Sequence, residues 1–224
     1  MRIDILTLFP EMFAPLQTSL LGRAQANNRV EINLIDIREF SQNKHKKVDD
    51  YPYGGGDGMV LTPQPLYDAI MSVKTDKSRV VYLSPKGRVM TQDLVKEFAT
   101  SYEHLVLVCG HYEGIDERII QLCIDDQVSL GDFVLTGGEI PAMALTDAIL
   151  RFVPDVLHNE HSAVDESFGD GLLEYPQYTH PREFMGLEVP EVLLSGNHKE
   201  IDKWRQEQKI LETKKYRPDL LDKK

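Results

Sequence analysis

Short apolar runs bounded by turn residues alternate with segments of helical periodicity along the first two thirds of the chain. The runs are rich in Val, Ile and Leu and predict β-strands at 3–9, 30–35, 79–83, 104–109 and 127–130. The segments between them predict helices at 19–27, 63–73, 91–100, 115–122 and 139–152. Strands that alternate with helices form parallel sheets covered on both faces. We therefore expect an α/β fold built on a mostly parallel sheet.

The pattern ends after Pro154. Residues 158–171 are polar and acidic and lack periodicity, which is typical of a mobile connector. A last helix is expected over 197–213, with Ile201, Trp204 and Leu211 on one stripe. We therefore divide the chain into three parts, an α/β domain, a flexible acidic connector and a small, mainly helical domain, at 1–157, 158–172 and 173–224.

The composition is that of a globular protein, with 42% apolar and 27% charged residues among 224. No apolar run approaches the roughly 18 residues that a membrane helix requires. Asp4 interrupts the first apolar run, so the N-terminus does not resemble a signal peptide. Both cysteines, Cys109 and Cys123, have apolar neighbours and are interpreted as reduced core residues. These features predict a cytoplasmic protein.

Charge is unevenly distributed along the chain. The net charge of −11 argues against a general nucleic-acid binder, which would normally be basic. Residues 198–224, however, hold nine Lys and Arg against six Asp and Glu, whereas 152–197 hold nine acids and one base, Arg182. A basic tail after an acidic connector indicates either a polyanionic partner or a solvated helix face. A second basic strip at 44–47, which includes His45, is a further candidate for phosphate contact.

Three glycine-containing loops are the candidate functional segments. Residues 53–58 hold four glycines in five positions, which permits positive φ and close approach of a ligand, yet they match neither phosphate-binding fingerprint. Residues 110–118 and 129–139 each follow a predicted strand and open a helix, where α/β sheets bind ligands. Glu113 can accept a hydrogen bond from a hydroxyl or amine, while Leu130 and Leu135 can wall an apolar slot. We expect the three loops to define one crevice.

Other kinds of site are disfavoured. The first strand runs into Pro10 without a glycine loop, which argues against an ordinary Rossmann nucleotide site. His158 and His161 have metal-like spacing but lack the H-E-x-x-H register and a cysteine partner, so we predict no metal site. The G-x-S-x-G elbow of a serine hydrolase does not occur.

Seven segments, in order along the chain, resemble the bacterial tRNA (guanine-N1)-methyltransferase family. They lie at 8–13, 49–59, 82–88, 109–118, 129–143, 171–179 and 189–198. The resemblance implies a SPOUT-type parallel sheet with a C-terminal trefoil knot at about 82–140. It also implies a homodimer with shared active sites, and a C-terminal domain that binds the tRNA anticodon stem-loop. The substrate would be the guanosine immediately 3′ of the anticodon, preceded by another guanosine.

The resemblance further implies that S-adenosylmethionine binds in the knot and leaves as S-adenosylhomocysteine. Backbone groups within 82–87, 110–114 and 130–138 would grip its adenine and ribose. The implied binding residues are Tyr82, Leu83, Ser84, Pro85, Gly87, Gly110, Tyr112, Glu113, Gly114, Leu130, Gly131, Asp132, Phe133, Val134, Leu135, Gly137, Gly138 and Pro141. The family also suggests magnesium (Mg2+), although no clear ligand set is visible in the sequence.

Two catalytic roles follow from the resemblance. A carboxylate must take the proton from guanine N1, and an arginine can stabilise the charge that builds on O6. Arg151 matches the family's arginine. The family's usual base is an Asp directly before Ser-Phe; here that position is Glu166, and Asp165 precedes it, so Glu166 is favoured and Asp165 is the alternative. His180 stands where arginine is common, and tRNA contact there is expected to be weaker or pH-sensitive.

Two competing functions share these features. A SPOUT-class methyltransferase of ribosomal RNA or of a ribose hydroxyl would use the same cofactor without regard to the tRNA base. A non-catalytic RNA- or nucleotide-binding module would bind without turnover, and the connector acid together with Arg151 argues against it.

Overall fold

The computed structural model describes residues 1–157 and 166–222. The chain divides into two compact units, Met1–His158 and Asn159–Lys224, which are described separately. In the described parts, no helix combines the length and apolarity needed to cross a membrane.

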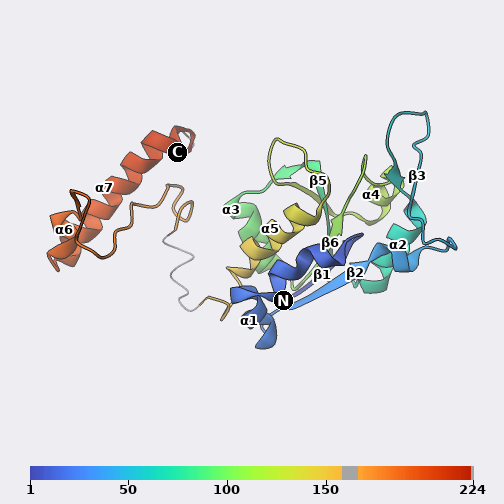
Figure 1. Ribbon diagram of the computed structural model, residues 1–224, viewed down its shortest axis with the longest axis horizontal. Helices are drawn as coiled ribbons and strands as arrows, with labels where there is room; N and C mark the ends of the chain where they lie inside the picture. Colours follow the sequence, from blue (N-terminus) through green and yellow to red (C-terminus); the bar gives the residue numbers. More distant parts are fainter. Residues whose placement is uncertain (158–165, 223–224) are drawn as a thin grey trace. The chain divides into compact units, whose positions relative to one another are not determined.

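The first unit is built on a five-stranded sheet in which every pairing is parallel (Figure 1). The strand order is β2-β1-β6-β5-β7. The strands are β1 (Arg2–Thr7), β2 (Glu31–Asp36), β5 (Ser78–Val89), β6 (His104–Cys109) and β7 (Asp126–Ser129). The predicted α/β class and its mostly parallel sheet are confirmed.

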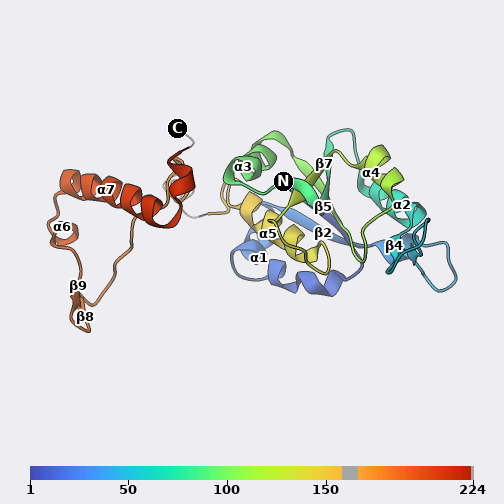
Figure 2. The same cartoon turned by 90° about the horizontal axis from the view of Figure 1, so that it is seen from above.

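Helices cover both faces of this sheet, as Figure 2 shows. They are α1 (Ser19–Ala26), α2 (Pro63–Val73), α3 (Gln92–Ser101), α4 (Glu117–Cys123) and α5 (Glu139–Leu150). Successive residues of the strands alternate between two cores, since Val81 and Leu83 pack with α1, α3 and α5 whereas Val80 and Tyr82 pack with α2 and α4. The predicted helices of this unit are therefore confirmed, with ends shifted by a few residues.

The structure adds elements that the apolar pattern did not reveal. Three are helical turns, η1 (Pro10–Gln17), η2 (Ile37–Phe40) and η4 (Pro218–Leu220). Two are short antiparallel pairs, β3 (Asp49–Asp50) with β4 (Val60–Leu61), and β8 (Glu183–Phe184) with β9 (Leu187–Glu188). Such short elements contain too few residues to show a period.

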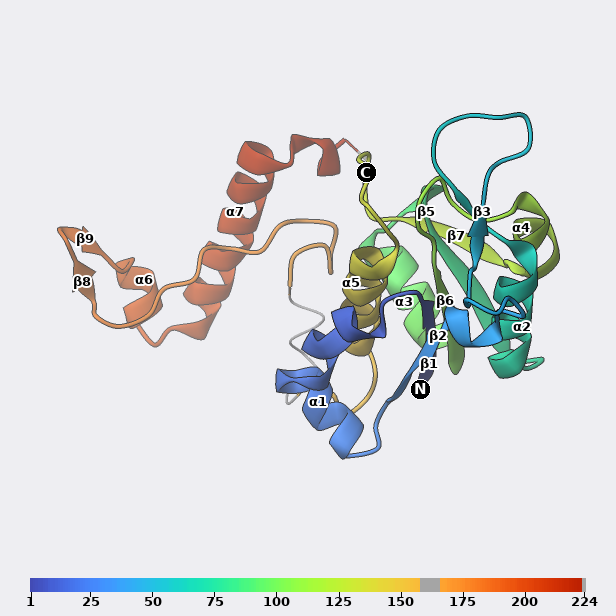
Figure 3. The same cartoon turned by 45° about the vertical axis from the view of Figure 1, so that its right-hand side comes forward.

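The second unit contains α6 (Glu191–Leu194) and the long helix α7 (His198–Tyr216), which appears with β8 and β9 in Figure 3. Helix α7 continues three residues beyond the expected end at Thr213 and stops before Arg217 and Pro218. The expected apolar stripe is wrong at Leu211, which is 54% exposed, whereas Lys209 and Thr213 are buried. Lys209 Nζ donates to Asp170 Oδ2 at 2.8 Å, and Thr213 Oγ1 accepts from the Leu173 amide at 2.8 Å. The buried face of this helix therefore combines the apolar Ile201 with the polar Lys209 and Thr213.

Candidate functional site

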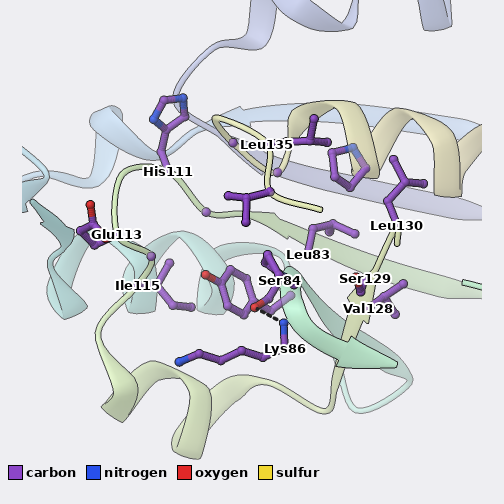
Figure 4. A pocket seen from close by; sticks show the side chains of 18 of the residues that line it. Leu83, Ser84, Lys86, His111, Glu113, Ile115, Val128, Ser129, Leu130 and Leu135 are labelled. Atoms are coloured by element: carbon purple, nitrogen blue, oxygen red, sulfur yellow. Dashed lines mark hydrogen bonds between the residues drawn. The ribbon is translucent and has the colours of Figure 1, made fainter. Parts of the chain in front are cut away.

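Residues 82–86 of β5 and the carboxyl ends of β6 and β7 surround a cavity of about 290 Å³, shown in Figure 4. Its lining includes Tyr82, Leu83, Ser84, Pro85, Gly110, Tyr112, Glu113, Gly114, Leu130, Phe133, Val134, Leu135, Gly137, Gly138 and Pro141. All of these are among the residues that the family resemblance implies for the cofactor. Three further residues of that set, Gly87, Gly131 and Asp132, do not line the cavity.

Backbone contacts hold the two main cavity loops together. The Gly138 amide donates to the Gly110 carbonyl at 2.8 Å, and His111 forms a bridge with Gly137. Gly138 lies so close to β6 that a Cβ there would be 2.7 Å from Cys109 Cα. Glycine at position 138 is therefore needed for this close approach of the two loops.

Tyr82 closes one side of the cavity. Burial raises the pKa of Tyr82, although hydrogen bonds to the Ile115 backbone and to Ser84 act in the opposite direction. A Cβ on Gly110 would lie 2.7 Å from the Tyr82 hydroxyl. The absence of a side chain at Gly110 therefore leaves space for the protonated Tyr82 hydroxyl.

The cavity wall is mixed in character. Leu83, Leu130 and Leu135 provide apolar surface, while few of its side chains are acidic or basic (Figure 4). Those side chains are Lys86, His111, Glu113 and Glu117. Such a site suits a planar heterocycle held by apolar contacts and backbone hydrogen bonds.

His111 occupies the rim of the cavity. Its ring centroid lies 5.1 Å from that of Phe9 and 5.1 Å from that of Tyr112. Its Nδ1 atom is buried and makes no hydrogen bond with any described residue. This imidazole is thus held by rings rather than by a polar partner.

Several lining residues were not among those proposed from the sequence. They are Lys86, His111, Ile115, Glu117, Ile120, Val128, Ser129 and Thr136. Most lie within or directly beside the glycine loops, so their position next to a proposed residue was the available signal. Ile115 and Glu117 lie in the candidate segment 110–118, whereas Ile120 lies further along α4 and outside every candidate segment.

The glycine-rich loop at 53–58 has the positive φ angles that were expected, but its glycines do not line the cavity. Gly54, Gly55, Gly56 and Gly58 all have positive φ. None of them lines the cavity, so the expectation that all three loops define one crevice is wrong. The loop instead connects to it through β4, where the Leu61 amide donates to the Gly114 carbonyl at 3.0 Å.

The catalytic candidates lie in different units. Arg151 follows the last residue of α5 in the first unit. Glu166 begins a turn of the second unit, in which its carbonyl accepts from the Gly169 amide at 3.0 Å. Asp165 lies outside the described residues, as do His158 and His161.

Metal-binding side chains do not cluster in the part of the chain that the structure describes. Residues 1–157 and 166–222 contain no group of three or more His, Cys, Asp or Glu that could hold an ion. Cys109 and Cys123 are buried free thiols, and burial raises the pKa of Cys109 well above its ordinary value, with a contribution from Glu139. No magnesium site is therefore assigned.

Comparisons with known proteins agree along the whole chain. Residues 1–223 match the family model described as tRNA (Guanine-1)-methyltransferase TrmD. A tRNA (guanine-N(1)-)-methyltransferase of Ruminiclostridium cellulolyticum is 54% identical over 227 residues, covering 100% of this chain and 97% of the relative. Proteins of the same name from Staphylococcus aureus and Staphylococcus carnosus are each 54% identical over 225 residues, covering 100% of this chain and 91% of the relative.

Proposed function

Because this chain belongs to the tRNA (guanine-N1)-methyltransferase family, we propose that its cavity beside β5, β6 and β7 binds S-adenosylmethionine. The protein is a methyltransferase that modifies N1 of guanine in tRNA. The observation that carries the proposal is the cavity itself, because its lining contains nearly all of the residues that the resemblance implies for the cofactor.

The residues present fit this cofactor. Leu83, Leu130 and Leu135 offer apolar surface for an adenine ring, and the glycine backbone at 137–138 can approach it closely. Glu113 can accept hydrogen bonds from ribose hydroxyls. When bound, the cofactor supplies an electrophilic methyl group on a sulfonium.

Glu166 and Arg151 are proposed to act on the guanine. N1 of guanine carries a proton, so its lone pair becomes available only when a base removes that proton. Glu166 would accept it, and the Arg151 guanidinium would stabilise the negative charge that builds on O6. Asp165 remains the alternative base, since it adjoins Glu166 in the chain.

A trefoil knot across about 82–140 is proposed on the path of β5. Leu83 and Arg88 both pair with Val128 of β7, so the residues between them leave the strand and return to the same partner. Gly87 in this excursion lies so close to β7 that a Cβ would be 2.5 Å from the Gln127 carbonyl oxygen. This excursion lies within the segment to which the family resemblance assigns the knot.

The remaining parts of the proposal concern the RNA and the assembly. The target would be the guanosine immediately 3′ of the anticodon, in a homodimer with shared active sites, as the resemblance implies. The basic residues of α7 and its flanks, in a tail with a net charge of +3, favour contact with phosphates.

The proposal is tested by methyl transfer from labelled S-adenosylmethionine to a pair of tRNA transcripts. One carries guanosine and the other adenosine immediately 3′ of the anticodon, and the two are otherwise identical. We expect label in the first transcript alone. Equal label in both, or label in neither under conditions where the cofactor binds, would contradict the assigned target.

A further inference from the structure

Glu139, the first residue of α5, has a buried carboxylate that the mechanism proposed above does not use. The residue is 1% exposed. Thr7 Oγ1, at the end of β1, donates to Glu139 Oε1 at 2.9 Å. Within the part of the chain that the structure describes, no Lys, Arg or His forms an ion pair with this carboxylate. A buried charge without an opposite charge beside it is costly, so the site favours a cation nearby.

The carboxylate lies against the wall of the cofactor cavity. Gly137 is part of that wall, and a Cβ added to it would overlap Glu139 Oε2. Because residue 137 has no side chain, Oε2 can lie directly against its backbone. Glu139 is not itself among the lining residues, so its effect on a ligand must come from its charge rather than from contact.

The charge of Glu139 already acts on a neighbouring group. Cys109 is the last residue of β6 and directly precedes Gly110, which lines the cavity. Burial raises the pKa of the Cys109 thiol well above its ordinary value, and the negative charge of Glu139 adds to this rise. The same charge would stabilise a cation in the cavity, because electrostatic attraction is stronger in the protein interior than in water.

Glu139 differs in this respect from the other charged side chains around the cavity. Glu113, Glu117 and Lys86 line it, but all three are exposed. Water and dissolved ions screen exposed charges, whereas a buried charge is screened much less. Glu139 should therefore have a larger effect on a bound cation than its distance from the ligand alone would indicate.

We propose that Glu139 is the residue by which the protein distinguishes the charged methyl donor from its neutral product. The inference rests on the function proposed above, because it takes the cavity to be the cofactor site. S-adenosylmethionine carries a positive sulfonium. When the methyl group passes to N1, the sulfur keeps the electron pair of the broken bond and becomes the neutral thioether of S-adenosylhomocysteine. The carboxylate thus favours binding of the donor and does not hold the product by its charge.

A purely structural role for Glu139 makes a different prediction. Glu139 is in the first turn of α5, where the helix dipole favours a negative charge, and its hydrogen bond to Thr7 joins α5 to β1. Loss of these interactions would loosen the cavity wall and weaken donor and product by the same factor. A loss confined to the charged ligand distinguishes the two roles.

The test measures dissociation constants for S-adenosylmethionine and S-adenosylhomocysteine by calorimetry without tRNA, so that no turnover occurs. It is done at about pH 8, where an ordinary imidazole such as that of His111 is uncharged. Glu139→Gln removes the charge and keeps an oxygen that can accept from Thr7. Thr7→Val combined with Glu139→Leu removes the charge without leaving a buried carboxylate or hydroxyl unpaired, and so provides a second variant if the first does not fold.

Two control variants keep the charge of Glu139. Thr7→Val removes only the hydrogen bond to the carboxylate. Asp93→Asn removes an equivalent charge elsewhere, because Asp93 is an exposed acid in the first turn of α3. Neither control should change the ratio of the two dissociation constants.

We expect each charge-removing variant to weaken S-adenosylmethionine about 10-fold (~1.4 kcal/mol) relative to S-adenosylhomocysteine, a size typical of one buried unit charge acting at an effective dielectric constant of about 20. Binding of S-adenosylhomocysteine should stay within about twofold of the wild type.

The proposal is overturned if the ratio is unchanged in the charge-removing variants, or if both ligands weaken equally. It is also overturned if Thr7→Val lowers the ratio as much as Glu139→Gln does, since that variant keeps the charge. Failure of the wild type to bind either ligand would instead contradict the cofactor assignment in the proposed function.

Discussion

Replacement of Gly87 by alanine should destabilise the first unit, because a side chain there has no space. The added Cβ would lie 2.5 Å from the Gln127 carbonyl oxygen, and closer still to the Gln127 carbonyl carbon and the Val128 nitrogen. Favourable contacts between heavy atoms are at ~3.5–4.0 Å. The neighbours are backbone atoms of β7, which cannot rotate away as a side chain would.

The size of the effect follows from two opposing contributions. Overpacking costs ~1–3 kcal/mol, and contact with strand backbone places this site at the upper end. Replacing glycine by alanine also restricts the unfolded chain, which offsets ~0.4–1 kcal/mol. We therefore expect the free energy of unfolding to fall by about 2 kcal/mol. With a urea dependence of ~2 kcal/mol per molar, the unfolding midpoint should fall by about 1 M.

The assay follows unfolding with two optical signals that report on different units of the chain. Far-UV circular dichroism reports mainly the sheet and helices of the first unit, whereas the single tryptophan, Trp204, lies in α7 of the second unit. Gly131→Ala is the matched control, because the three atoms nearest its Cβ all belong to the Phe133 ring, which is 54% exposed and able to move. The dichroism midpoint should fall for Gly87→Ala, with little change for Gly131→Ala or in Trp204 fluorescence. An unchanged midpoint for Gly87→Ala would refute the close approach of β5 and β7.

Three further predictions concern catalysis, RNA binding and the second unit. Glu166→Ala should abolish methyl transfer while cofactor affinity, measured by calorimetry, stays within about twofold; full activity in this variant would move the base to Asp165. The Kd for tRNA should rise roughly 20- to 40-fold between 50 and 200 mM salt if three phosphates are neutralised, and a flat response in filter binding would contradict the role given to residues 198–224. Burial alone would raise the pKa of Asp170, but hydrogen bonds from Lys209 and the Leu172 amide outweigh it and hold the pKa below its ordinary value. The stability this carboxylate provides is therefore present above about pH 4 and lost as the pH falls through its lowered pKa, so Trp204 fluorescence should show acid unfolding of the second unit that is weaker in Asp170→Asn.

The sheet of the first unit could be predicted from the sequence, because strands buried on both faces appear as short runs of apolar residues. The strand β6 at 104–109 is the clearest case, because every one of its residues is buried. A short run of this kind, apolar almost throughout, is typical of a strand buried on both faces of a parallel sheet. The same signal is missing from β3 and β4, which are two residues each and depend on partners distant in the chain.

The candidate site was predictable only where glycine motifs mark it. Gly110 and Gly137 identified their loops as places of close approach, and both line the cavity. The position of the 53–58 loop was not predictable, because it depends on the pairing of Leu61 with Ile115, a contact between segments more than fifty residues apart.

The most direct test of the central claim is a crystal structure of the protein with S-adenosylhomocysteine. The account predicts the adenine against Leu83, Leu130 and Leu135, with the backbone of 110–114 and 137–138 in hydrogen-bond contact with the ligand. Ligand density at another place on the protein, with this cavity occupied by solvent, would contradict the assignment.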